Sequence, residues 1–233
     1  MCKRCSIEHH RRVSECPTFI FLKESIVPLQ HLYKYIKITD KVITVLALLS
    51  FGFSGIRADF MIIGLYLFLF PYLYLTHRRH AVFHLLLSSV VACSWLFVAR
   101  EQYGYNRELL VIGGYNIYPL FAWAVGLFGV FLMYAHWVPV FRKMVFLKKM
   151  IFFTALYWLL LFGSEILAYR FFNFRNIATA QYAGLPFLDC IHAPDWMKVA
   201  YLLNGPAYFL LCEFLGLPDP TIIMRKSVCL QEE

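Results

Sequence analysis

Six apolar stretches divide the chain, and together they predict a bundle of membrane-spanning helices. A helix needs about 20 apolar residues to cross the hydrocarbon layer of a membrane, and most of the stretches reach or approach that length. The pattern therefore predicts an all-α, polytopic membrane protein with six transmembrane helices. The stretches cover residues 42–56, 60–75, 81–99, 117–138, 150–169 and 197–217.

The positions of the basic residues orient this predicted bundle. With the N-terminus in the cytoplasm, sixteen of the 22 Lys and Arg residues fall on the cytoplasmic side. Loops that remain in the cytoplasm carry an excess of positive charge, so we expect both termini inside, an N-in/C-in arrangement. The six basic residues left outside are Arg57, Arg100, Arg107, Arg170, Arg175 and Lys198.

This arrangement divides the chain into three parts. Residues 1–41 form a basic cytoplasmic tail, residues 42–217 the transmembrane domain and residues 218–233 a cytoplasmic C-terminal tail. Within the first tail, residues 18–38 mix apolar and basic groups and predict an amphipathic segment in the headgroup layer, broken by Pro28. We expect no cleavable signal peptide, because the first tail lacks a compact apolar core.

The composition agrees with a membrane location. Hydrophobic residues make up 61% of the chain and charged residues only 15%, which is more apolar surface than a soluble domain could keep from water. The net charge of +8 lies beside helix ends, where it would face anionic lipid, and no nucleic-acid recognition motif accompanies it. We therefore expect lipid and no nucleic acid as a partner, in the cell membrane or in an internal membrane of a eukaryotic cell.

Glu165 is the most suggestive residue for function. It lies about one turn from the outer end of the fifth predicted helix, in the sequence FGSEILAY. A carboxyl group at that depth is costly unless it faces a polar cavity or a partner. Glu165 is therefore a candidate proton donor. The alternatives are a structural hydrogen bond to a neighbouring helix, or a side chain that reaches the membrane surface.

The connection 170–196 supplies three further candidates for chemistry. Asp189, His192 and Asp195 lie in DCIHAPDW, where the Asp-x-x-His spacing suits proton transfer or metal ligation. The segment carries too many aromatic and aliphatic residues to remain in water, so we expect it to pack as a lid over the outer end of the bundle. Asp189 and His192 would then point toward Glu165. The alternative is a solvated loop in which Asp195 caps the sixth helix.

Three residues near the same face complete the predicted site. Asn204 lies two residues before Pro206 in the sixth helix, where the proline frees a backbone carbonyl that must find another donor. Such a break can line a cavity, or it can simply kink a packed helix. Asn116 and Trp196 lie at the outer ends of helices, and we assign them with Asn204 to substrate binding.

The histidines and cysteines of the inner face and the N-terminal tail yield no assigned metal site. His80 and His84 lie one turn apart, a spacing that resembles the first box of membrane desaturases and hydroxylases, but the His-x-x-His-His boxes that those enzymes also need are absent. A heme held by His84 and His136 is an alternative, and contact of the histidines with lipid phosphate is the favoured interpretation. The cofactor stays unknown. The tail cysteines are spaced irregularly for a structural zinc site: Cys2, Cys5 and Cys16.

Two functions remain open from the sequence. The leading hypothesis is a membrane enzyme that acts on a lipid or isoprenoid substrate from an outward-facing cavity. Glu165 would be the acid, and Asp189, His192 and Asp195 would be the base, orienting groups or metal ligands. The 23 Phe and 15 Tyr residues suit a large apolar substrate, although they also fill membrane cores. The alternative is a non-enzymatic accessory subunit of a membrane complex or a transporter component, with its aromatic faces buried against a membrane-protein partner.

Overall fold

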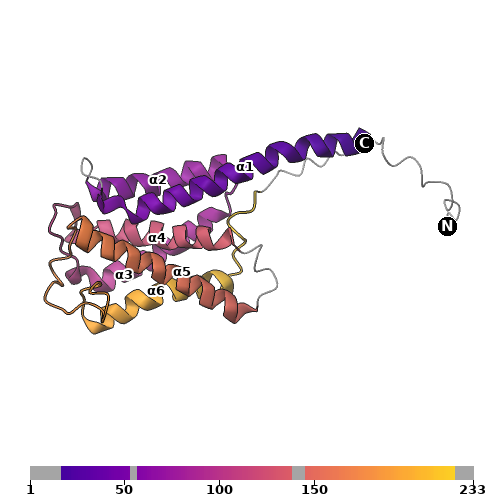
Figure 1. The fold of residues 1–233 in the computed structure, drawn as a ribbon. Coiled ribbons are helices and arrows are strands. Elements are labelled where there is room, and N and C mark those ends of the chain that lie inside the picture. The colour runs from indigo at the N-terminus through magenta and orange to yellow at the C-terminus, as the bar shows by residue number, and fades with distance from the viewer. Residues whose placement is uncertain (1–16, 53–56, 138–144, 224–233) are drawn as a thin grey trace. The chain divides into compact units, whose positions relative to one another are not determined.

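Helices make up most of the described part of the chain in the computed structural model (Figure 1). Short turns extend two of them: a 3-10 turn follows α3, and a π-helical turn, Leu167–Phe171, continues α5. A two-stranded hairpin, β1 (Val111–Ile112) and β2 (Tyr115–Asn116), lies between α3 and α4. The helices are α1 (Pro17–Leu48), α2 (Ala58–Leu75), α3 (Ala81–Ala99), α4 (Tyr118–Ala135), α5 (Phe146–Ile166) and α6 (Asp195–Phe214).

The structure describes residues 17–52, 57–137 and 145–223, and for residues 17–32 the backbone alone. The contacts divide the chain into two units that join between Thr39 and Asp40, and the packing below concerns the second unit. Some of the sequence-based expectations fall outside the described residues. These are the tail cysteines Cys2, Cys5 and Cys16, and several of the basic residues counted on the cytoplasmic side, among them Arg142, Lys143, Arg225 and Lys226.

Four of the helices are long and apolar enough to cross a membrane, which is compatible with an integral membrane protein. They are α2, α3, α4 and α5 together with its π turn, and each coincides with a predicted stretch. The prediction of a helical membrane protein is confirmed to that extent, and the six spans and the orientation stay predictions. The remaining two helices carry several charges within their length, among them Lys34, Lys37, Asp40 and Lys41 in α1 and Asp195, Lys198 and Glu213 in α6.

The first helix differs from the sequence prediction. The break expected at Pro28 is not present, because α1 runs without interruption from Pro17 to Leu48. A 3-10 turn at Ser50–Gly52 follows it. The first predicted stretch, 42–56, therefore comprises the last turns of α1 and this 3-10 turn, and its final residues lie outside the described part.

Helix α4 is the central element of the second unit and contacts α2, α3, α5 and α6. Figure 1 shows it between α2 on one side and α5 and α6 on the other. A helix that is apolar all round lies either in a protein core or in a membrane, and α4 has this composition, with 67% of its residues buried in the protein. At Gly129 a side chain would come within 2.9 Å of the Thr44 hydroxyl of α1, so the glycine allows the two helices to approach.

A buried ion pair joins α1, the α2–α3 turn and the end of α4. Both terminal nitrogens of Arg78 donate hydrogen bonds to the Asp40 carboxylate, at 2.8 and 2.9 Å. The His136 Nε2 lies 2.7 Å from Asp40 Oδ2, and the Tyr72 hydroxyl donates to Oδ1 at 2.8 Å. The Asp40 and Arg78 side chains are fully buried. His136, which was predicted to contact lipid phosphate, therefore lies in the protein interior together with Arg78.

The other inner histidines hold the C-terminal segment. His80 Nε2 lies 2.9 Å from the Asp219 carbonyl oxygen, and His84 Nε2 lies 2.8 Å from the Pro218 carbonyl oxygen. His84 Nδ1 also lies 3.5 Å from the Cys212 sulfur. These contacts occupy both ring nitrogens of His84 and the Nε2 of His80, so the structure favours a packing role for the two histidines.

Removal of the Asp40 charge should destabilise the protein strongly. Asp40→Asn leaves the Arg78 guanidinium buried without a counter-charge, and such a loss costs about 3–5 kcal/mol in unfolding free energy. Unfolding of the purified protein in detergent measures this. The double variant Asp40→Asn/Arg78→Met should regain part of the loss, because it removes both charges.

The matched control is Glu101→Gln. Glu101 lies on the surface, 3.6 Å from an exposed Arg100 nitrogen, and such pairs contribute little. Its unfolding free energy should stay close to that of the wild type. An Asp40→Asn protein as stable as Glu101→Gln would show that the ion pair does not hold the three elements together.

Both termini should lie on one side of the membrane and the β1–β2 hairpin on the other. Ile112 in this hairpin is 59% exposed. In a variant without native cysteines, Ile112→Cys should react with a membrane-impermeant maleimide from the side opposite to terminal tags. Cys190, restored alone, should stay unlabelled, because burial raises the pKa of its thiol to about 11. Reaction of a terminal tag and of Ile112→Cys from the same side would contradict the six-span arrangement.

Candidate functional site

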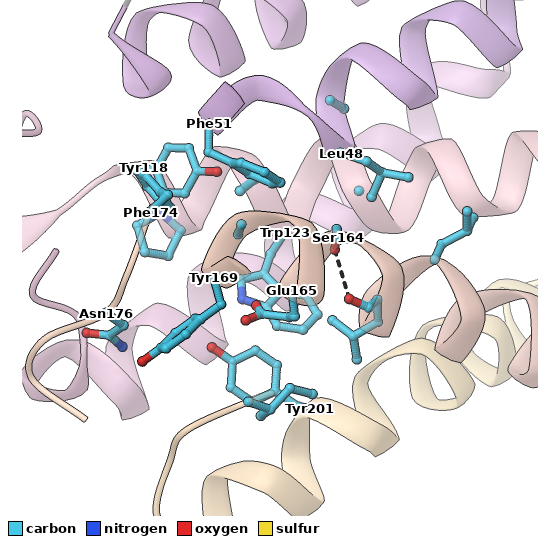
Figure 2. Close-up of a pocket in the computed structure, with 18 of the residues that line it drawn as sticks. Leu48, Phe51, Tyr118, Trp123, Ser164, Glu165, Tyr169, Phe174, Asn176 and Tyr201 are labelled. Atoms are coloured by element: carbon cyan, nitrogen blue, oxygen red, sulfur yellow. Dashed lines mark hydrogen bonds between the residues drawn. The ribbon is translucent and has the colours of Figure 1, made fainter. Parts of the chain in front are cut away.

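A cavity of about 150 Å³ lies inside the second unit (Figure 2). It is situated at the end of the bundle that carries the segments 100–117 and 172–194, which we call the loop end. Its walls come from the last turn of α1, from α4, α5 and α6, and from both loop segments. Most of the lining side chains are aromatic or aliphatic, so the cavity is an apolar site with few polar groups.

Two helices supply the longest walls, and each does so with a single face. Residues three and four apart lie on the same side of a helix, so a regular spacing in the sequence becomes one surface. The face of α5 and its π turn consists of Tyr157, Leu160, Leu161, Ser164, Glu165, Ala168 and Tyr169. The face of α4 consists of Tyr118, Pro119, Ala122, Trp123, Gly126, Leu127 and Val130.

The Glu165 side chain faces this cavity. Figure 2 shows it among Trp123, Tyr169 and Tyr201. Two other acids of the described chain are buried, and both have partners: Asp40 pairs with Arg78, and Asp59 accepts hydrogen bonds from Arg57 and from the Leu110 amide. Among the described residues, by contrast, no hydrogen-bond donor or cationic side chain pairs with the Glu165 carboxyl group.

A hydrogen-bond cluster of aromatic side chains forms the wall beside Glu165. The Tyr103 hydroxyl accepts hydrogen bonds from the indole nitrogens of Trp95 at 2.6 Å and Trp123 at 3.2 Å. Since both of its acceptor positions are used, Tyr103 must donate its own hydrogen to the Tyr201 hydroxyl, 3.2 Å away. Burial raises the pKa of Tyr103 to about 12, so it stays a neutral phenol. The Tyr201 O–H is left to donate into the cavity.

Hydrogen bonds join the two loop segments to each other beside the cavity. The Asn176 side chain accepts a hydrogen bond from the Gly104 amide and donates one to the Gln102 carbonyl, at 3.0 and 2.6 Å. The Ile177 amide donates to the Gly104 carbonyl at 2.6 Å. These bonds fix the backbone on both sides of Tyr103 and so position the centre of the aromatic cluster.

The structure brings His192 to the cavity of Glu165, and Asp189 to His192. His192 lines the cavity, and its ring stacks on Tyr169 with the centroids 4.6 Å apart. The His192 Nε2 lies 3.2 Å from Asp189 Oδ1, whose side chain is 74% exposed. Asp189 therefore reaches the site only through His192, as a group that can orient the imidazole.

The other predicted site residues lie outside the cavity lining. Asp195 is fully exposed and pairs with Lys198 at 3.0 Å. Asn116 is buried, and its side-chain oxygen accepts a hydrogen bond from the Tyr118 amide at 3.1 Å, so it caps the start of α4. Trp196 is half exposed and packs against Trp95, with ring centroids 5.9 Å apart.

Asn204 also lies outside the lining, and the break in α6 is used for helix packing. Pro206 cannot donate to the Leu202 carbonyl, and that carbonyl accepts a hydrogen bond from the Trp158 indole at 3.0 Å instead. A side chain at Gly205 would overlap the ring of Tyr157. The Asn-Gly-Pro sequence thus brings α6 against α5, and the freed carbonyl is satisfied by a tryptophan.

Part of the segment 172–194 packs against the helices of the second unit. Phe174, Cys190 and Ile191 are buried, and Ile191 lines the cavity. Phe187 is fully exposed and has a positive φ of 67°, a conformation that costs free energy for a bulky residue. The expected lid therefore covers the cavity with one face of the segment, while Phe187 points away from the protein.

Several cavity residues were not identified from the sequence. Tyr103, Trp123, Tyr169 and Tyr201 were treated as general aromatic filling. One signal was available, because Tyr169 follows Glu165 by four residues and must share its helix face. Nothing comparable marks Tyr103 or Tyr201, whose positions depend on long-range packing.

Removal of the Tyr103 hydroxyl should weaken the loop end. Tyr103→Phe leaves two indole N–H groups without an acceptor in a buried position, which should lower the unfolding free energy by about 1–3 kcal/mol. Thermal unfolding in detergent measures the change. The control Tyr115→Phe removes only a contact with Arg100 on the surface and should have little effect. Equal stability of the two variants would show that the aromatic cluster does not depend on this hydroxyl.

In comparisons with models of protein families, with curated proteins and with solved structures, nothing matches this chain. The described residues also contain no group of three or more His, Cys, Asp or Glu side chains that could hold a metal ion. A function can therefore be inferred only from the geometry of the Glu165 cavity.

Proposed function

We propose that this chain is a multi-pass membrane protein that takes a lipid or isoprenoid molecule into the Glu165 cavity and acts on its polar end as an enzyme. The membrane is the cell membrane, or an internal membrane in a eukaryotic cell. One observation carries the proposal: the Glu165 carboxyl group faces an aromatic cavity and has no partner among the described residues. A carboxyl group in such a position is costly, and a bound molecule is the partner that offsets the cost.

The distribution of polar groups along the cavity supports an amphipathic molecule. Glu165, Tyr169 and His192 lie toward the loop end. The wall of α5 continues from Glu165 back to Tyr157, about 12 Å at 1.5 Å per residue, and the lining there is apolar apart from Ser164 and the tyrosine. A molecule with one polar end and an apolar body would match both regions.

Glu165 is the group that acts on the polar end in this proposal. A carboxyl group can donate a proton to a bound oxygen or nitrogen atom and take it back in a later step. His192 in the same cavity is a second group that can move a proton, and Asp189 orients its ring. The Tyr201 O–H can donate a hydrogen bond to the same bound atom.

The accessory-subunit alternative has one observation in its favour. Phe171 and Phe187, beside and within the lid segment, are exposed where lipid does not necessarily cover them. A partner chain could bury both rings. That function would leave the Glu165 cavity without a role, however, so ligand content separates the two proposals.

Glu165→Gln should remove the bound molecule without unfolding the protein. Glutamine keeps the shape of the side chain but can neither carry the charge nor deliver a proton. Organic extracts of the purified wild type should contain a lipid or isoprenoid compound by mass spectrometry, and extracts of Glu165→Gln should contain about tenfold less. Glu101→Gln is the control and should keep the compound. The proposal is wrong if Glu165→Gln retains the full amount.

A second pair of variants tests the cavity without touching Glu165. Gly126 lines the cavity, and a Cβ there would have no atom within 4 Å, so Gly126→Leu can fill the space. The substitution should also improve helix propensity by up to about 1 kcal/mol. Gly64→Leu places the same side chain at an equally open site on α2 outside the cavity lining. Gly126→Leu should lose the compound and Gly64→Leu should keep it; equal content in both would place the compound elsewhere.

A further inference from the structure

We infer that the polar end of the bound molecule is a protonated amine, held as an ammonium group against Glu165 and within the ring of aromatic side chains. This inference rests on the proposed function, because it requires that the Glu165 cavity binds a ligand. It adds the chemical class of the polar end, which the proposed function leaves open.

The charges of the lining residues favour a cation. The lining contains one acidic side chain, Glu165, one imidazole, His192, and no Lys or Arg. The arginines nearest in sequence are engaged elsewhere: Arg170 is exposed and lies 3.4 Å from the Leu188 carbonyl, and the Arg175 guanidinium lies over the Tyr169 ring. A carboxylate removed from water is stabilised by a counter-charge at close range. Since the protein provides none among the described residues, a cationic ligand fits this position.

The aromatic side chains favour an organic cation. The faces of Trp and Tyr rings carry negative electrostatic potential and attract ammonium groups within about 6 Å of the ring centre. The same attraction is seen at the cavity rim, where the Arg175 guanidinium lies 5.3 Å from the Tyr169 ring centroid. The aromatic side chains that line the cavity around Glu165 include Tyr103, Tyr105, Trp123, Tyr169 and Tyr201.

The hydrogen-bond capacity of the site also fits an amine. A primary ammonium group has three N–H donors and no acceptor, so it needs oxygen atoms around it. Glu165 offers two carboxylate oxygens, and the Tyr105 and Tyr169 hydroxyls have no hydrogen-bond partner among the described residues. A phosphate or carboxylate end would instead need basic side chains, which the lining lacks. A metal ion would need several more oxygen ligands than this single carboxylate provides.

The net charge of the chain helps to distinguish local binding of an amine from general attraction. The net charge of +8 repels cations in general, so a preference for an amine over an uncharged analogue must come from a local group. Hexadecylamine and 1-hexadecanol share one chain length and differ in the polar end. Hexadecanoate adds a negative end to the series.

Binding of the three probes can be followed through tryptophan fluorescence of the purified protein in detergent, since Trp123 lines the cavity. The wild type should bind hexadecylamine at least about tenfold more tightly than 1-hexadecanol, with hexadecanoate weakest. Glu165→Gln should bring the amine down to the affinity of the alcohol. Glu165→Asp, which keeps the charge, should retain most of the preference, and the surface variant Glu101→Gln should retain all of it.

The outcomes separate this inference from the proposed function. If the wild type binds amine and alcohol equally and Gly126→Leu loses both, the cavity binds a ligand but the ammonium assignment is overturned. If the amine preference survives in Glu165→Gln, Glu165 is not the counter-charge and the assignment is also overturned. If Gly126→Leu binds all three probes as the wild type does, the proposed function fails together with the inference.

Discussion

A charge inside an apolar bundle must have a partner, and this requirement accounts for the Asp40 ion pair at one end of the bundle and for the Glu165 cavity at the other. Asp40 meets it within the chain, through Arg78, His136 and Tyr72, and thereby ties the end of α1 to the α2–α3 turn and to α4. Glu165 does not meet it among the described residues, because its neighbours are aromatic rings. A stable carboxylate at one end and an unpaired carboxyl group at the other follow from the same physical cost. The first is an element of the fold, and the second is the position at which we propose that a ligand binds.

The same requirement, applied to neutral polar groups, shapes the cavity. Four aromatic side chains beside Glu165 satisfy one another: two indole N–H groups end on the Tyr103 hydroxyl, which in turn donates to Tyr201. Because the two indole N–H groups and the Tyr103 O–H are used within the cluster, they do not compete for Glu165, and of the four side chains Tyr201 alone keeps an O–H that can donate into the cavity. The rings remain in place as an aromatic wall of the cavity.

The sequence predicted the four apolar helices α2, α3, α4 and α5, because apolar length is a property of each segment alone. It also identified Glu165, since an acid within an apolar helix is conspicuous without knowledge of its neighbours. It did not foresee that α1 continues through Pro28, because a single proline removes one hydrogen bond that the rest of a long helix can tolerate. Asn116 and Asn204 looked like ligand-binding groups, yet Asn116 caps α4 and Asn204 lies outside the cavity lining. Whether an amide side chain serves the backbone or a ligand depends on contacts that no local pattern contains.

The helices determine where the cavity lies, and the loop segment 172–194 adds the polar side chain of His192 to it. Glu165 is held on a regular helix face, so its position is set by α5 itself. His192 comes from a segment with several non-glycine residues at positive φ, including Asp189, and such backbone is kept only where surrounding contacts enforce it. The Asp189–His192 contact and the stacking of His192 on Tyr169 provide those contacts. The helix thus positions Glu165, while the segment with positive φ values brings the imidazole of His192 to the same cavity, so that helix and loop each contribute one group that can move a proton in the proposed site.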